Sequence, residues 1–153
     1  MVDSCFDIST AGDFYEKIVK PQHQDFLDNN ASSRYALLSI LVTYHLHEWV
    51  GGKFEFGQTY KHKFFKDAFL ERYPGFETEA EYFEVARRIC NDTKHFLERA
   101  ETRTQSGYSS SYSDSYARPL MIKISEDKEV SVDCLLKCLL AFWKKMKADG
   151  IFK

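Results

Sequence analysis

The sequence predicts a mainly α-helical protein, a bundle of four to five helices with a small β-hairpin before the C-terminal helix. Apolar residues recur at helical spacing in several segments. One of these segments, residues 34–50, is apolar almost all round, which is typical of a helix at the centre of a bundle. Two short stretches between residues 120 and 132 alternate with period two instead, as paired strands do.

Length and composition predict a single domain over residues 1–153. The formal net charge of −2 argues against a generally basic nucleic-acid binder. The four cysteines include no C-x-x-C pair, so we expect no zinc framework. We also expect no bound cofactor. The first ten residues lack the basic start and apolar run of a signal peptide, and no apolar run is long enough to span a bilayer. We therefore expect a cytoplasmic protein that does not bind membranes.

The first helical pattern follows Thr10, which forms a capping pattern with Asp13. Pro21 lies inside this pattern and either kinks one helix or separates two, standing at the start of the second. Residues 28–30 are expected to turn, and Ser32 or Ser33 can cap the next helix, residues 34–50. Two glycines at 51 and 52 are expected to end that helix.

Two histidines lie near the end of the predicted central helix. His45 shares a stripe with Arg34, Leu38, Leu41 and Trp49 and is expected to be a core or edge histidine. His47 points to nearly the opposite face, so the two imidazoles cannot bind one metal ion from a regular helix.

Residues 53–63 mix aromatic and basic side chains in a predicted loop, and residues 64–73 are expected to form a short helix. Such a mixture either packs on the core as a lid or contacts single-stranded nucleic acid through stacking and charge. Lys61 and Lys63 are the RNA-binding candidates of this loop.

Residues 78–99 carry the strongest helix pattern of the chain. Thr78 and Glu81 form a capping box. One stripe is apolar and must face a core; it contains Tyr82, Val85, Ala86, Ile89, Cys90, Thr93, Phe96 and Leu97. A second, narrow stripe beside it contains Arg88, Asp92, His95 and Arg99. Its members either form ordinary ion pairs on a solvated helix edge or combine an imidazole with a cation that can hold a phosphate.

Residues 101–118 are rich in Ser and Tyr and are expected to form a flexible loop. The predicted hairpin pairs residues 120–124 with residues 129–132 around a turn at 125–128. Ser131 or Asp133 then starts the last helix, and Gly150 ends it.

Two acidic residues three positions from a histidine suggest a metal site as an alternative. His45 and Glu48 are spaced i, i+3, and so are Asp92 and His95. An imidazole and a carboxylate from each of two facing helices can form a four-ligand or dinuclear site.

Two motifs carry a resemblance: YHLHEWV at 44–50, and ICNDTKHFLE at 89–98 with Asn91, Lys94 and His95 in its Asn-x-x-Lys-His-Phe core. With the hairpin and the Ala-Phe-Trp of the last helix, the chain resembles a group of small bacterial proteins of unknown function. More distantly, Arg88 with six residues before His95 resembles the R-x(4–6)-H pattern of the HEPN superfamily, helical and often dimeric proteins of which many are metal-independent ribonucleases.

The HEPN resemblance implies a catalytic pair. His95 would transfer the proton at a ribose 2′-hydroxyl, Arg88 would hold the scissile phosphate, and Asn91 would support them. Lys94 would join Lys61 and Lys63 in binding RNA. The chain departs from the usual pattern because Ile89, an apolar residue, follows Arg88.

Three functions follow from these patterns. We expect a non-catalytic interaction module of bacterial or phage and mobile-element origin, since aromatic residues are abundant and no strong catalytic motif occurs. The alternative is a HEPN-like ribonuclease or RNA-binding protein, acting as a homodimer. The second alternative is a metal-binding helical bundle.

Overall fold

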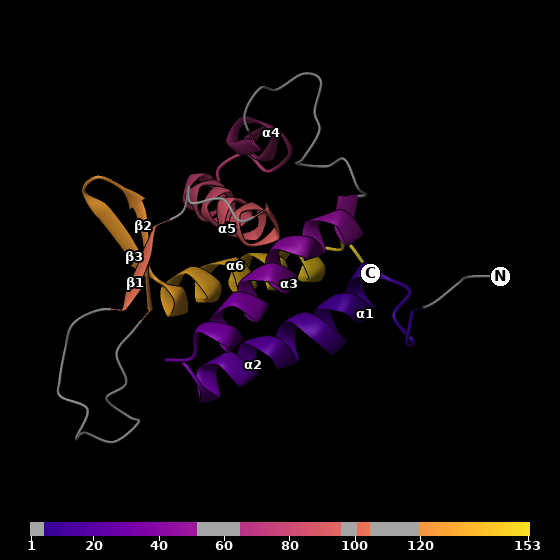
Figure 1. The fold of residues 1–153 in the computed structure, drawn as a ribbon. Helices are drawn as coiled ribbons and strands as arrows, with labels where there is room; N and C mark the ends of the chain where they lie inside the picture. The colour runs from indigo at the N-terminus through magenta and orange to yellow at the C-terminus, as the bar shows by residue number, and fades with distance from the viewer. Residues whose placement is uncertain (1–4, 52–64, 96–100, 105–119) are drawn as a thin grey trace.

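The computed structural model describes residues 5–51, 65–95, 101–104 and 120–153. Helices pack around one hydrophobic core, and a three-stranded antiparallel sheet lies at one end of the molecule (Figure 1). The predicted fold class, a helical bundle with a hairpin before the last helix, is confirmed. Every helix within the described ranges is too short or too polar to traverse a bilayer.

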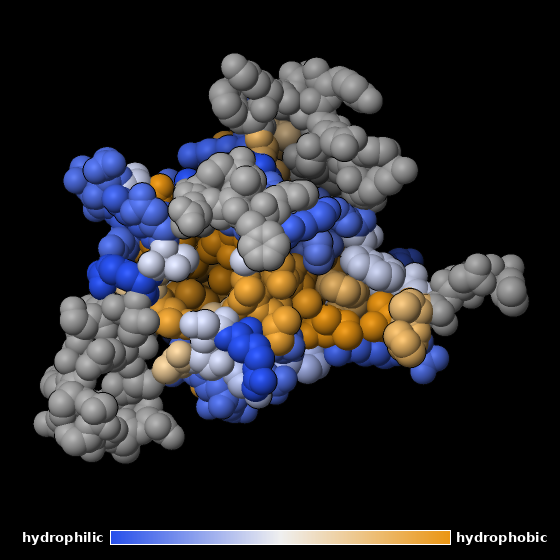
Figure 2. All heavy atoms as spheres, viewed as in Figure 1, coloured by the Kyte–Doolittle hydropathy of each residue, from blue (hydrophilic) through white to orange (hydrophobic). Residues whose placement is uncertain are grey.

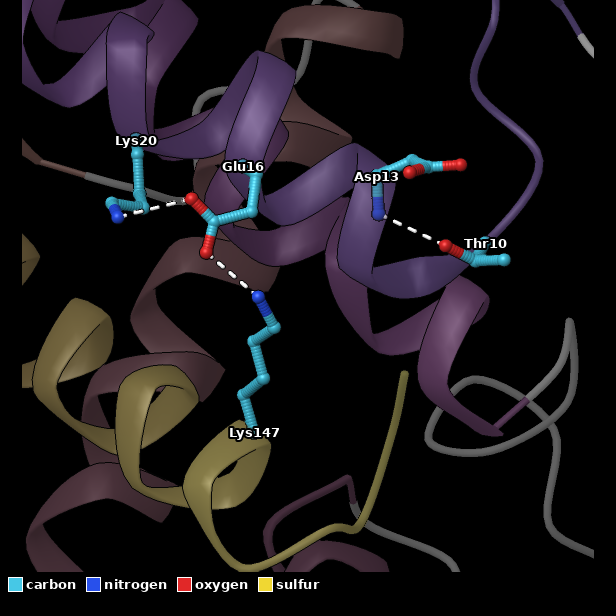
Figure 3. Close-up of polar contacts among 5 residues, drawn as sticks. All are labelled: Thr10, Asp13, Glu16, Lys20 and Lys147. Carbon is cyan, nitrogen blue, oxygen red and sulfur yellow. Dashed lines mark hydrogen bonds and ion pairs between the residues drawn. The ribbon is translucent and has the colours of Figure 1, made fainter.

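The first helical run consists of α1 (Ala11–Phe14), a π-helical turn η1 (Tyr15–Val19) and α2 (Lys20–Asp28). Thr10 caps it as predicted, because its Oγ1 accepts a hydrogen bond from the amide of Asp13 at 3.0 Å (Figure 3). Pro21 stands in the first turn of α2, but the chain stays helical through it. A proline lacks the amide and collides with the carbonyl four residues earlier, and the wider π turn just before Pro21 is a local adjustment that avoids this collision.

Helix α3 (Ser33–Gly51) runs antiparallel to the first run and contacts α2, α5 and α6 (Figure 1). Of the two predicted caps, Ser32 and Ser33, the structure uses Ser32. Its Oγ accepts a hydrogen bond from the amide of Tyr35 at 3.4 Å, and its carbonyl accepts one from the amide of Ala36. An apolar helix in this central position confirms the prediction from its sequence.

Helices α4 (Phe65–Arg72) and α5 (Glu77–His95) form an antiparallel pair. The predicted capping box at the start of α5 is wrong. The carbonyl of Phe76 accepts from the amide of Ala80, so Thr78 lies inside the first turn. Glu81 instead accepts from the ammonium of Lys128 at 2.6 Å, an ion pair with a distant strand that no local pattern can predict. Residues 96–99 of the predicted helix lie outside the described residues.

The centre of the core is aromatic. Phe69, Phe83, Phe142 and Trp143 are fully or almost fully buried, and the contacting pairs have ring centroids 5.1 to 5.5 Å apart. The indole Nε1 of Trp143 donates to the carbonyl of Thr43 at 3.0 Å, so this buried donor is satisfied. Phe83 lies outside the predicted core stripe of its helix, but α4 and α6 both pack on α5 and enclose it.

The sheet has the strand order β1-β2-β3, with β1 (Thr102–Thr104), β2 (Leu120–Ser125) and β3 (Lys128–Ser131). The predicted hairpin is confirmed, and its turn is Glu126 and Asp127. The prediction of a loop over residues 101–118 is wrong at 102–104, which pair with β2; residues 105–118 lie outside the described residues. Ile122 and Val130 are buried cross-strand partners, and both hairpin strands contact α6.

Helix α6 (Val132–Ala148) begins at the predicted cap Ser131, whose Oγ accepts from the amide of Cys134 at 3.1 Å. The turn that ends it contains Gly150, whose φ is +77°, and the amides of Gly150 and Ile151 donate to the carbonyls of Lys147 and Met146. Beyond this turn, the amide of Gly12 donates to the carbonyl of Lys153 at 2.8 Å. A Cβ at position 12 would lie 2.6 Å from the Lys153 carbonyl carbon, so the close approach requires glycine.

Candidate functional site

The residues predicted to be catalytic lie on the C-terminal half of α5. Arg88 is half-buried, and its Nε lies 4.0 Å from the carboxylate of Glu84. This Nε is shielded from solvent and has no hydrogen-bond partner in the part of the chain that the structure describes. Because it has no acceptor there, the Nε–H of Arg88 can still donate a hydrogen bond. Asn91 is half-buried in the next turn of α5.

The other half of the predicted pair is His95, the last residue of α5. The structure describes its backbone but not its side chain. Lys61 and Lys63 lie outside the described residues, and Lys94 is exposed. The pairing of Arg88 with His95 and the RNA contacts of the three lysines stay predictions.

The alternative metal site involves α3 and α5. His45 and Glu48 are exposed on α3, and Asp92 is buried on α5. Among the described side chains, no group of three or more His, Cys, Asp and Glu residues is placed to hold a metal ion. Because the set also needs the side chain of His95, this alternative stays a prediction.

A polar cluster that was not predicted from the sequence lies between α3 and α5. It consists of Tyr44, His47, Glu84, Arg87 and Cys90. His47 is only 2% exposed, and its ring centroid lies 4.5 Å from that of Tyr44. On the facing helix, the guanidinium of Arg87 donates to both carboxylate oxygens of Glu84, at 2.7 and 2.9 Å. His45, expected in the core or at its edge, is exposed instead. When a helix is apolar all round, its sequence does not reveal which face points inward. The packing of α5 against α3 therefore decides which of the two histidines is buried.

Burial keeps three ionisable side chains of this cluster neutral, those of His47, Tyr44 and Cys90. It lowers the pKa of His47 to about 4, with a further lowering from the neighbouring His45. It raises the pKa of the Cys90 thiol to about 12 and raises the pKa of Tyr44 as well. A nucleophilic cysteine needs a lowered pKa, and a general base works best with a pKa near the pH of its reaction. The cluster therefore has the properties of a buried structural element.

A hollow of about 440 Å³ opens where the sheet meets the helices. We call it the α3–α5–sheet hollow. Its floor is apolar and formed by residues far apart in the sequence, including Ala36 and Ile40 of α3, Ile89 of α5 and Ile122 of β2. Figure 2 shows the apolar residues gathered in the middle of this face, with hydrophilic residues around them. The hairpin packs on α6, which leaves a space between the sheet and the other two helices.

The rim of the α3–α5–sheet hollow is polar and contains Ser33, Thr93, Thr102 and Arg103. Arg103 is the one ionisable residue among its described lining, and its guanidinium forms a two-pronged ion pair with Glu129 across the sheet. This hydrogen bond raises the pKa of Arg103. None of Arg88, Asn91 and Asp92 lines the hollow, although Ile89 and Thr93 of the same helix do. The sequence contains a partial signal of this hollow, because α3 has more apolar positions than a single core-facing stripe needs.

Searches with this chain match no protein-family model, no curated protein and no solved structure.

Proposed function

We propose that this protein is a non-catalytic interaction module that binds an apolar segment of a partner protein in the α3–α5–sheet hollow. The observation that carries the proposal is the apolar floor of this hollow between two helices and a sheet, which the described residues leave uncovered. Soluble proteins cover most large apolar surfaces, and those that stay open commonly bind a ligand or a partner.

The size of the hollow defines the occupant. A volume of about 440 Å³ accommodates a few apolar side chains and not a folded domain. The described residues do not enclose the hollow completely, so the rest of a partner segment can continue past the rim. An apolar centre within a polar rim is also the usual anatomy of a protein–protein interface, in which a few buried anchors supply most of the binding energy.

The chemistry of the lining supports binding over catalysis. An acid–base or nucleophilic reaction needs an ionisable or activated group that points at the substrate. The described lining offers hydroxyl groups, apolar side chains and a single guanidinium, and that guanidinium is engaged by Glu129.

Selection from a displayed random peptide library, followed by fluorescence polarisation with the selected peptides, measures this activity directly. Leu37, half-buried on α3, lines the hollow, whereas Leu38, the next residue, is 41% exposed and does not. We expect Leu37→Ser to weaken binding about tenfold or more, because loss of an interface anchor removes well over 1 kcal/mol. Leu38→Ser is the matched control and should bind like the parent.

A blocking variant tests the same site without removing core contacts. Thr93 is exposed on the rim, and Thr93→Arg places a long side chain over the mouth. It should abolish peptide binding while the thermal unfolding temperature stays close to that of the parent. Peptides that bind Thr93→Arg and the parent equally well would exclude the hollow as the docking site. A library that yields no apolar peptide would contradict the interaction module itself.

A metal-independent ribonuclease or RNA-binding dimer is the second candidate. The observation that favours it is the half-buried guanidinium of Arg88, whose Nε–H has no acceptor in the described part of the chain while Arg87 engages Glu84. Such a group can donate to a phosphate. His95 lies two turns further along the same helix.

Incubation of the purified protein with labelled RNA in the presence of EDTA decides between the two candidates. A ribonuclease should cleave the RNA, and Arg88→Ala and His95→Ala should each reduce the rate by at least about a hundredfold. Lys94→Ala, an exposed neighbour on the same helix, should reduce RNA affinity and leave the cleavage rate of bound RNA unchanged. RNA that stays intact with the parent protein rules out catalysis.

A further inference from the structure

A second hollow, of about 250 Å³, lies between the first helical run and α6. We call it the α2–α6 hollow. One wall contains Tyr15, Lys20, His23 and Gln24, and the other wall, formed by α6, contains Lys144. None of these residues lines the α3–α5–sheet hollow, so the two hollows can be tested separately.

Cations outnumber anions beside the α2–α6 hollow. Lys20 and Lys147 share the carboxylate of Glu16, with Nζ–O distances of 3.0 and 2.7 Å (Figure 3). Lys144 forms no ion pair among the described residues, and its side chain is exposed. Two ammonium groups on facing walls, of which one lacks a counter-ion, attract an anion into the space between them.

The π turn builds one wall of the α2–α6 hollow. In a regular α-helix, Tyr15 and Lys20 would lie about 140° apart around the axis, because each residue advances about 100°. The amide of Lys20 instead bonds to the carbonyl of Tyr15, five residues earlier, and this brings the two residues onto one face. The ammonium of Lys20 lies 5.7 Å from the centre of the Tyr15 ring. π turns are uncommon and recur at functional sites.

His23 supplies a polar group that the protein itself leaves unused. Its ring is half-buried beside Phe26, and its Nε2 is shielded from solvent without a hydrogen-bond partner among the described residues. Burial lowers the pKa of His23, and the carboxylate of Asp133 acts in the opposite direction. A buried imidazole nitrogen without a partner is unfavourable, and since His23 lines the hollow, an oxyanion bound there would offer the ring an acceptor.

We propose that the α2–α6 hollow binds the phosphate group of a small phosphorylated molecule. Lys20 and Lys144 supply the charge from opposite walls, and the ring N–H of His23 and the side-chain amide of Gln24 donate hydrogen bonds. A phosphate offers enough acceptor oxygens to engage both walls at once, whereas a carboxylate has only two. The hollow is large enough for one such group and too small for an extended polyanion.

Titration of the isotopically labelled full chain with inorganic phosphate, at ionic strength held constant with chloride, tests the site by NMR. The amide signals of Lys20, His23, Gln24 and Lys144 should shift together and reach saturation. Lys144→Gln should weaken phosphate binding about tenfold, because it removes a charge-assisted hydrogen bond. Lys145→Gln is the matched control, since Lys145 is the next residue, pairs with Asp149 and does not line the hollow. It should change the affinity by less than about twofold.

Three results would overturn the proposal. Shifts that do not saturate, or that saturate equally in Lys144→Gln, mean that no phosphate site exists in the α2–α6 hollow. Acetate that binds as tightly as phosphate would assign the site to carboxylates. Vesicles of phosphatidylcholine and phosphatidic acid that bind the parent but not Lys144→Gln, under conditions where inorganic phosphate does not bind, would assign it to a lipid headgroup. All variants fold if their amide spectra outside the hollow match that of the parent.

Discussion

Helices α3 and α5 bury two regions of different chemistry. In the aromatic core, Phe83 of α5 contacts Phe69, Phe142 and Trp143, and the indole nitrogen donates to a carbonyl of α3. Further along the same helix pair, the polar cluster of Tyr44, His47, Glu84, Arg87 and Cys90 buries groups that can ionise. The aromatic core therefore stabilises the fold at any pH. In the polar cluster, burial of His47, Tyr44 and Cys90 is favourable only where these three groups are neutral.

The largest expected effect comes from the aromatic core. Phe83→Ala removes a fully buried ring that packs against three others, and we expect the free energy of unfolding to fall by about 4 kcal/mol, from lost burial and the cavity left behind. Urea unfolding at pH 7 measures it. Phe6→Ala is the matched control, because Phe6 is 93% exposed, and it should change the stability by less than about 0.5 kcal/mol. Equal losses in the two variants would contradict the position of this core.

The second prediction concerns the polar cluster and pH. An unfolded His47 has an ordinary pKa of about 6.5, and burial lowers it to about 4 in the folded protein. As the pH falls through this interval, the unfolded chain binds the proton first, so acid favours unfolding. The stabilising contribution of the neutral ring is complete above about pH 7, and about 3 kcal/mol is lost between pH 6.5 and 4.

The measurement compares urea unfolding of the parent and His47→Leu between pH 7.5 and 4. The variant should lose less stability on acidification, since it has no buried imidazole to protonate at this position. His45→Gln, two residues away and exposed, should keep most of the pH dependence of the parent. His23 adds a loss of the same sign in all three proteins because burial lowers its pKa too. Identical pH profiles for the parent and His47→Leu would show that this ring is not buried in a neutral form.

The smallest expected effect tests a polar contact of the aromatic core, the hydrogen bond donated by the Trp143 indole. Trp143→Phe keeps an aromatic ring but removes the Nε1–H that donates to the Thr43 carbonyl. We expect a loss of about 1 to 2 kcal/mol, for the hydrogen bond and the smaller ring, without any change in the pH dependence. Tryptophan is absent at position 143 in the variant, so circular dichroism is the better probe. A change in the pH profile would mean that the aromatic core and the polar cluster are coupled.

Much of the local structure could be predicted from short stretches of sequence. Thr10, Ser32 and Ser131 cap their helices as their positions indicate, and Gly150 ends the last helix. The hairpin follows from period-two alternation on either side of a short turn. Each of these features depends on bonds between residues a few positions apart.

The failures have a different origin. The box at Thr78 was expected from a spacing alone, but Glu81 bonds to Lys128 of the hairpin, 47 residues away. Strand β1 has only three residues, and it becomes a strand because β2 lies beside it. The alignment of Tyr15 with Lys20 depends on a π turn, which a period of 3.6 residues cannot reveal.

The candidate sites show the same division. Arg88 was identified from a helical stripe and Asn91 from the family resemblance, and the structure places both in the C-terminal half of α5. The α3–α5–sheet hollow was not identified, because its floor combines residues such as Ile40, Ile89 and Ile122 that meet only in the folded chain. The α2–α6 hollow likewise needs Lys144 to be brought opposite His23.

The sequence by itself determined several helix caps and the hairpin with its turn, because caps, turns and periodicity act over a few neighbouring residues. Only the tertiary structure decided that His47 and not His45 is buried, that a third strand joins the hairpin, and where two hollows open between the elements. The physical reason is that the faces that meet are set by the total burial and hydrogen bonding among distant segments. That total depends on all segments together, so it cannot be obtained from any one of them alone.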